Sequence, residues 1–110
     1  MATTYKVLGQ VAPGATTDTT LYTVPASTEA VISTLIIANR ASSAATYRIA
    51  IRPNAATLAN LHYIAYDVTV AAGDSTTLTL GLTMDAADVI TVRGSTADLS
   101  FSAFGSEITP

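Results

Sequence analysis

The sequence contains no cysteine and a single histidine, His62. Without cysteine the chain has no disulfide framework and no thiolate metal ligand, and one histidine is too few for a zinc site within one chain. The longest uninterrupted apolar run, residues 35–38, is far shorter than the roughly 20 residues that span a bilayer. The N-terminus also lacks a charged region followed by an apolar one, which is the pattern of a signal peptide. We therefore expect no cofactor, no metal and no membrane contact.

Charge is also scarce. Asp, Glu, Lys and Arg make up 12% of the chain, about half of the usual quarter. Only five residues are cationic and they are spread along the sequence, so they form no basic surface for phosphate groups, and nucleic-acid binding is disfavoured. Thr, Ser and Ala take the place of the missing charge, which leaves a weakly hydrated surface suited to packing against other protein subunits. A neutral, Thr-rich β-protein with no special partner is the simpler alternative.

What is present is a β pattern. The 110 residues are enough for one domain, and we expect a single β-sandwich over residues 1–110, with residues 1–12 as its first strand or as an extended N-terminal arm. Apolar residues alternate at positions 47, 49 and 51 and again at 78, 80 and 82, as in half-exposed strands. About eight short strands, Gly/Pro/Asp turns and no convincing helix predict an all-β fold, an antiparallel and jelly-roll-like β-sandwich.

Residues 21–39 are the most apolar stretch of the chain. Pro25 interrupts it, and a long strand over residues 29–39 follows. Strict alternation divides this strand into two faces, and both are largely apolar. The strand is therefore either central and covered on both sides, or its outer face meets another subunit. The two predicted faces are Val31, Ser33, Leu35 and Ile37, and Ala30, Ile32, Thr34, Ile36 and Ala38.

Catalytic and metal-binding patterns are weak. His62 would need a nucleophile and an orienting acid beside it to form a triad, and a strand histidine packed beside tyrosines or facing solvent is the simpler interpretation. No glycine-rich phosphate loop leads from a strand into a helix. Four Asp residues in predicted turns do not have the spacing of a calcium loop, so we interpret them as turn caps. We predict that the chain is not an enzyme. The four are Asp74, Asp85, Asp88 and Asp98.

Four tyrosines allow two interpretations. They would suit a carbohydrate-stacking surface, together with the loop over residues 53–60. Tyrosine is also at home at the margin of a β-core or at a subunit interface, with the ring buried and the hydroxyl wet, and we favour this second interpretation. The four are Tyr22, Tyr47, Tyr63 and Tyr66.

Several motifs resemble a known family. LYTVPA at residues 21–26, EAV at 29–31 and the apolar strand that ends at Asn39 are similar to a pattern met in small virion proteins of tailed bacteriophages. The similarity extends through residues 49–53, 62–67 and 101–108, so it covers most of the chain. It implies a β-sandwich protein of the head decoration or cement type. The second half is more loosely similar to trimeric jelly rolls of the tumour-necrosis-factor and complement C1q type, which implies a homotrimer.

The resemblance and the low charge together favour a non-enzymatic cement protein on the capsid surface of a virion assembled in the host cytoplasm. It would bind the major capsid protein or another virion protein and stabilise the head through symmetric contacts. We predict subunit contacts at Ile32, Thr34 and Ile36, on the outward face of the long strand. Residues 2–7, with Tyr5 and Val7, are predicted to clasp a capsid neighbour by strand addition. A tail or head-fibre component that binds host-surface glycan is the alternative.

Overall fold

The computed structural model describes residues 2–110, which form eight strands and two short 3₁₀ turns. The strands are β1 (Ala2–Val11), β2 (Thr19–Thr23), β3 (Glu29–Asn39), β4 (Ala45–Arg52), β5 (Tyr63–Val70), β6 (Ser75–Met84), β7 (Val89–Gly94) and β8 (Leu99–Thr109). The 3₁₀ turns η1 (Pro53–Ala55) and η2 (Asn60–His62) lie between β4 and β5. No helix among these residues is long and apolar enough to cross a membrane.

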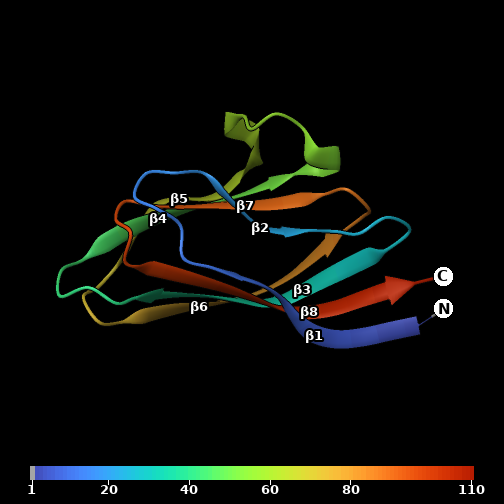
Figure 1. Ribbon diagram of the computed structural model, residues 1–110, viewed down its shortest axis with the longest axis horizontal. Coiled ribbons are helices and arrows are strands. Elements are labelled where there is room, and N and C mark those ends of the chain that lie inside the picture. The colour runs from blue at the N-terminus through green and yellow to red at the C-terminus, as the bar shows by residue number, and fades with distance from the viewer. Residues whose placement is uncertain (1) are drawn as a thin grey trace.

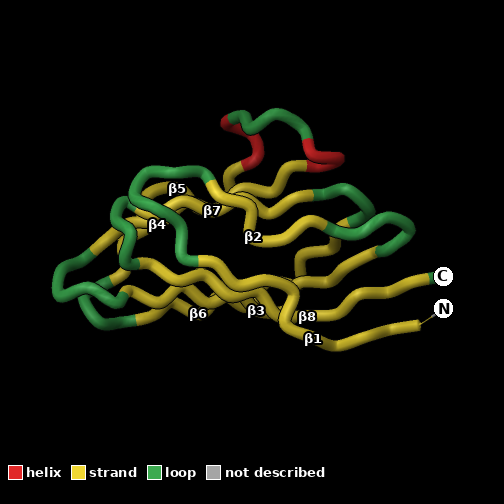
Figure 2. Tube along the Cα trace, viewed as in Figure 1, coloured by secondary structure: helices red, strands yellow, loops and turns green. Residues whose placement is uncertain are grey.

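The strands form two antiparallel sheets that pack face to face (Figures 1 and 2). One sheet has the order β1-β8-β3-β6 and is called sheet A here; sheet B has the order β2-β7-β4-β5. Strand β1 therefore pairs with β8, β2 with β7, β3 with β6 and β4 with β5. This nested pairing is that of a jelly roll, in which a long hairpin is rolled up so that its two halves lie in both sheets. The predicted all-β jelly-roll sandwich is confirmed.

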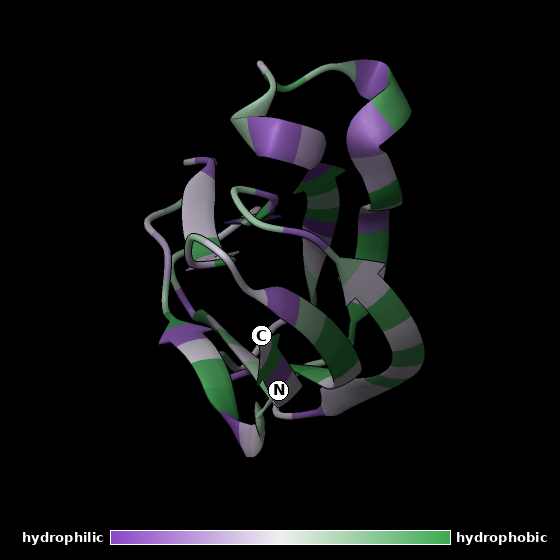
Figure 3. Cartoon of the chain, turned by 90° about the vertical axis from the view of Figure 1, so that its right-hand side faces the viewer, coloured by the Kyte–Doolittle hydropathy of each residue, from purple (hydrophilic) through white to green (hydrophobic). Residues whose placement is uncertain are grey.

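The core fills the space between the sheets. Its largest fully buried side chains come from both sheets, and Tyr47 of β4 meets Phe101 of β8 edge to face, with ring centroids 6.4 Å apart. Along the strands apolar residues are interleaved with polar ones, as the banded colouring of Figure 3 shows. Each fully buried aliphatic side chain contributes roughly 1.5–3 kcal/mol to folding. The alternation predicted for residues 78–82 matches the structure, since Leu78, Leu80 and Leu82 pack against this core.

Sheet A is bent along a row of β-bulges. Opposite Phe104 and its neighbours in β8, β1 carries the extra residue Leu8 and β3 carries the extra residue Ser33. The partner strand β6 then has its own irregularity around Gly81, whose φ is +75°. A bulge leaves one residue unpaired and exchanges the two faces of the strand beyond it. The outward and inward sides of β3 therefore change over at Ser33.

The bulge corrects one predicted site residue. Ile32 was expected on the outward face of the long strand with Thr34 and Ile36, but its side chain is fully buried in the core. After the bulge, Leu35 and Ile37 continue the inward side, while Thr34 and Ile36 lie outward and are half-buried. Ile32 is therefore a core residue and does not lie on the outward face with Thr34 and Ile36.

Two glycines permit close approaches in the same region. A Cβ at Gly105 of β8 would overlap the carbonyl oxygen of Val31 in β3, and a Cβ at Gly9 of β1 would overlap the carbonyl oxygen of Leu21 in β2. Both overlaps are with backbone, which cannot move aside as a flexible side chain can. Glycine is therefore required where β1 crosses toward sheet B and where β8 passes the bulge in β3.

The N-terminal segment is a strand and not a free arm. Its pairing with β8 runs from Ala2 opposite Thr109 to Val11 opposite Phe101. One side of β1 is therefore occupied within the chain, while its other side is the edge of sheet A. Strand β5 begins at Tyr63, because residues 60–62 form the 3₁₀ turn η2.

Candidate interaction surfaces

The outer side of sheet A is almost free of charge. By the pairing register, its outward positions include Tyr5 and Val7 of β1 and Phe104 of β8 beside Thr34 and Ile36 of β3. The remaining outward positions are mostly Ser and Thr. Among the outward positions of these four strands, within the described residues, Glu29 at the start of β3 is the sole charged one. We call this surface the neutral face.

A shallow hollow of about 600 Å³ crosses the neutral face along the line of the bulges. Phe104 and Val31 form its apolar part, and the exposed ring of Tyr5 stands at its β1 side. At this point β8 and β3 approach closely, because Gly105 has no side chain that would hold the two backbones apart. The hollow is lined by Tyr5, Lys6, Val31, Ser33, Phe104, Gly105 and Ser106.

Four of the five residues predicted for contacts lie on the neutral face. Tyr5, Val7, Thr34 and Ile36 come from two strands that β8 separates, and together they occupy one side of sheet A. Their role in binding stays a prediction. Phe104 was not predicted as a contact residue; the sequence places it opposite Phe101 and Ala103 in the alternation, but which of the two sides meets solvent depends on the sandwich.

The outer side of sheet B differs in chemistry, because three of the five cationic residues, Arg48, Arg52 and Arg93, lie there. Arg48 donates two hydrogen bonds to Asp67, from Nε at 2.7 Å and from Nη2 at 3.2 Å. Arg93 Nη1 lies 3.7 Å from Asp18 Oδ1. Arg52 donates to the loop carbonyl of Ala56 at 2.7 Å and to the hydroxyl of Thr91 at 3.2 Å. We call this surface the arginine face.

An aromatic cluster lies at the β5 side of the arginine face. The Arg48 guanidinium stands 4.0 Å from the centre of the Tyr66 ring, and Tyr63 meets Tyr66 edge to face at 4.9 Å. Asp67 has φ of +53°, at a bulge in β5. The hydrogen bonds from Arg48 hold the pKa of Asp67 below its ordinary value. The cluster therefore fixes an irregular piece of an edge strand and leaves Tyr66 exposed.

The four tyrosines do not form one surface. Tyr22 and Tyr47 are buried in the core, so the less favoured interpretation, a stacking surface of all four tyrosines, does not hold. Both lie on the inward side of sheet B, because the register sets Tyr22 opposite Ile90 and Ile49 opposite Val92. Only Tyr63 and Tyr66 lie on the arginine face. The preferred interpretation, core or interface, holds for the buried pair.

Tyr22 also holds the carboxylate of Glu107 in place through a hydrogen bond. Its hydroxyl donates a 2.5 Å hydrogen bond to Glu107 Oε2, and Lys6 Nζ donates to Glu107 Oε1 at 3.1 Å. These hydrogen bonds lower the pKa of Glu107, with the bond from Tyr22 as the main cause. Burial raises the pKa of Tyr22, and its bond to the carboxylate raises it further. The contact joins β2 of sheet B to β8 and β1 of sheet A.

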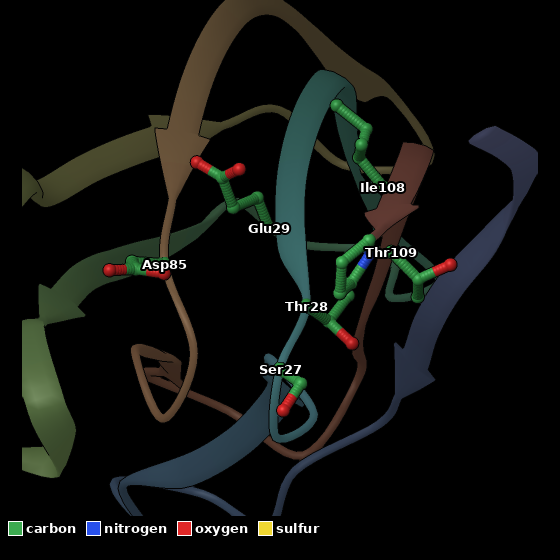
Figure 4. A pocket seen from close by; sticks show the side chains of 7 residues that line it. Ser27, Thr28, Glu29, Asp85, Ile108 and Thr109 are labelled. Atoms are coloured by element: carbon green, nitrogen blue, oxygen red, sulfur yellow. The ribbon is translucent and has the colours of Figure 1, made fainter. Parts of the chain in front are cut away.

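The predicted turn caps are confirmed for Asp74, Asp85 and Asp88, whose side chains accept hydrogen bonds from the backbone N–H groups of Ser75, Ala86 and Asp85 respectively. In the fourth turn the acceptor is the Thr96 hydroxyl, to which the N–H of Asp98 donates. Asp88 Oδ1 also accepts from the N–H of Asn54, which ties the loop after β4 to the start of β7. Asp85 and Glu29 line a hollow of about 550 Å³ near the C-terminus (Figure 4). Across residues 2–110 no three His, Cys, Asp or Glu side chains form a group that would hold a metal ion.

His62 has a structural role in its turn. It is buried at the end of η2, and its Nδ1 accepts a hydrogen bond from the backbone N–H of Ala59 at 3.0 Å. The simpler interpretation left a packed and a solvent-facing histidine open; the residue is buried, and it lies in a 3₁₀ turn and not in the predicted strand. This contact uses the imidazole to close the loop over residues 53–62.

Comparison with known proteins supports the fold class. No family model matches the chain, and no curated protein matches its sequence. A solved structure titled "Structure of infectious bursal disease virus Gx strain" contains a chain with a TM-score of 0.50 at 12% identity, over 96% of the present chain. The match covers 31% of that longer chain. At this identity the likeness shows the fold alone, so the class defined here is the eight-stranded jelly-roll β-sandwich.

Proposed function

We propose that this chain is a non-enzymatic structural protein of a virion, and more specifically a capsid decoration or cement protein of a tailed bacteriophage. It binds the assembled head as a homotrimer and stabilises the shell by burying area at symmetric contacts. The observation that carries the proposal is the neutral face, whose outward strand positions hold mainly hydroxyl and apolar side chains and one charge, Glu29, while the side chains of Lys6 and Arg40 reach its margins. Such a surface costs little to desolvate, and interface cores are depleted in charge.

Two further observations support the proposal. Eight-stranded jelly rolls form viral capsid subunits as well as lectin domains, and the similar solved chain comes from a structure of a virus. The resemblance of residues 21–39 to small phage virion proteins points to the same class. Because one fold hosts many functions, the surface carries more weight than the fold.

The direct test is to mix the purified protein with undecorated phage capsids and to image the particles. The proposal expects uniform added density at symmetry-related positions, and capsids that withstand heat or low ionic strength longer than undecorated ones. Particles without added density, under conditions in which the protein is folded, would contradict the cement role.

A pair of matched variants tests which surface makes the contact. Thr34→Glu introduces a charge into the neutral face, and we expect it to lower capsid binding at least tenfold because the new carboxylate would be desolvated without a partner. Thr20→Glu introduces the same charge into β2 of sheet B, where the side chain is exposed, and it should bind as the unmodified protein does. Unchanged binding by both variants would place the contact elsewhere, and equal loss in both would show that the effect of the charge is not specific to the neutral face.

Glycan binding by a tail or head-fibre component is the second candidate. The observation that favours it is the exposed Tyr66 ring beside Tyr63 and the paired Arg48 and Asp67, a combination of an aromatic surface with hydrogen-bonding groups. A glycan array probed with the protein and with Tyr66→Ala tests it. Retention that Tyr66→Ala abolishes, without any capsid binding, would favour the adhesin over the cement protein.

A further inference from the structure

The exposed large apolar side chains lie on two edge strands and on the 3₁₀ turn that precedes one of them. Within residues 2–110, six large apolar residues are exposed, and each lies on or next to a strand at the edge of a sheet. Two belong to β1 and form what we call the β1 patch: Tyr5 (83% exposed) and Val7 (49%). Four lie in η2 and β5 and form the β5 patch: Leu61 (83%), Ile64 (46%), Tyr66 (56%) and Val68 (39%).

The two patches lie on opposite margins of the sandwich. Strand β1 ends sheet A and packs beside β2, whereas β5 ends sheet B and lies on the side of β3 and β6 (Figure 1). Each edge strand keeps a row of backbone N–H and C=O groups without a partner strand. The charged residues of these strands, Lys6 and Asp67, are engaged in ion pairs with Glu107 and Arg48 of the same chain. Among the described residues, neither β1 nor β5 therefore carries an unpaired charge that would oppose its pairing with another chain.

We propose that the β1 edge of one copy packs against the β5 edge of the next, and that this head-to-tail contact closes into the trimeric ring. The inference rests on the proposed homotrimer and assigns its interface. A two-fold dimer through either patch buries that patch against itself and leaves the other in water. A head-to-tail contact covers both patches with one kind of interface, and it forms a ring when the rotation closes.

The exposed area suits such a contact. Taking about 200 Å² as the accessible surface of a tyrosine and roughly 150 Å², the lower end of that range, for each smaller aliphatic residue, the exposed fractions amount to about 360 Å² for the β5 patch and about 240 Å² for the β1 patch. One contact would then bury about 600 Å² of apolar surface, and a typical interface is a little over half apolar. The whole contact would bury about 1,050 Å², close to the roughly 1,000 Å² expected of a specific interface.

Complementation between two charge variants tests the inference. Tyr5→Glu blocks the β1 patch and Leu61→Glu blocks the β5 patch, and both positions are so exposed that folding should be unaffected, as circular dichroism would verify. Light scattering after size exclusion should give a trimer of about 34 kDa for the unmodified chain, three times its 11.3 kDa. Each variant alone should be a monomer. An equimolar mixture should form a heterodimer of about 23 kDa, because each variant supplies the patch that the other has lost.

Other outcomes overturn the inference. If Tyr5→Glu becomes monomeric while Leu61→Glu stays a trimer, the contact uses the β1 patch alone; the reverse result would point to the β5 patch alone. A mixture that remains monomeric at high micromolar concentration excludes the head-to-tail geometry, as does an unmodified chain that is itself monomeric. Capsid binding is measured separately, so a monomer that decorates capsids would refute the ring and leave the cement role standing, whereas a trimer that ignores capsids would do the opposite.

Discussion

Glu107 couples the two sheets through its charge, and this makes its contribution to stability dependent on pH. Its pKa lies below the ordinary value of 4.5 because it accepts hydrogen bonds from Tyr22 and Lys6. The stabilisation is therefore complete above about pH 5 and is lost as the pH falls through the lower pKa of the folded state. We expect Glu107→Gln to lower the free energy of unfolding by about 1.5–3 kcal/mol at pH 7, the range for a hydrogen bond to a charged group.

Urea unfolding at pH 7, 5, 4 and 3 measures this effect. The difference between the unmodified protein and Glu107→Gln should shrink toward the acid end of the series. Tyr22→Phe removes the main cause of the lowered pKa, so it should also reduce the dependence on acid. A difference that stays constant from pH 7 to pH 3 would mean that the Glu107 charge contributes nothing.

Two turns of similar sequence place a glycine and an alanine in the same left-handed backbone conformation. Gly73 and Ala87 occupy the same place before Asp74 and Asp88, and both have positive φ, +65° and +70°. Alanine in this region costs about 1–2 kcal/mol and glycine costs nothing. Because glycine also loses more entropy on folding, we expect Ala87→Gly to raise the free energy of unfolding by up to about 1 kcal/mol. Gly73→Ala should lower it by a similar amount, and thermal unfolding of both variants measures the two signs.

The sequence predicts part of these turns. Small residues followed by Asp predict a capped turn, and Gly73 predicts the positive φ of the first one. At Ala87 nothing in the residue type signals a left-handed backbone, because the conformation is imposed by the Asp88 bonds to Asp85 and Asn54. If Ala87→Gly is destabilising, the contacts of the alanine methyl group outweigh its backbone strain.

At the scale of the element, β3 explains why one predicted contact residue was wrong. Strict alternation sets Ile32 with Thr34 and Ile36, and the bulge at Ser33 separates them. The pattern does not reveal the slip, because both sides of this strand are apolar enough to be read as core. The bulge is fixed by its neighbours, where Gly105 lets β8 approach and Gly81 relaxes β6. Both glycines lie outside β3, so the sequence of β3 alone does not predict the bulge.

The two isoleucines of β3 give a test of this assignment. Ile32→Ala removes a fully buried side chain and should lower the free energy of unfolding by about 2–5 kcal/mol. Ile36→Ala truncates a half-buried side chain on the neutral face, so it should cost about 1 kcal/mol or less. Chemical denaturation of the two variants under one condition makes the comparison. Equal costs, or a larger cost at position 36, would contradict the bulged register.

At the scale of the molecule, turn spacing and alternation were sufficient for the class of fold and the number of strands. They did not decide which tyrosines are buried. Tyr22 and Tyr47 face the core and Tyr66 faces water because of how the sheets are stacked, a relation between residues far apart in the chain. The edge positions of β1 and β5 follow from the strand order in the same way. The sequence contains the apolar residues of both patches, and the topology determines that they remain exposed.

The two outer faces of the sandwich predict different responses to salt. Binding through the neutral face involves little charge, so raising NaCl from about 0.05 to 0.5 M, which shortens the Debye length about threefold, should change the dissociation constant for capsids less than about threefold. Binding through the arginine face would weaken strongly, because exposed charge pairs are screened. Arg93→Gln on that face should leave capsid affinity unchanged, whereas Ile36→Glu on the neutral face should lower it at least tenfold. Affinity that falls both with salt and with Arg93→Gln would assign capsid contact to sheet B, and the neutral face would then be free for another partner.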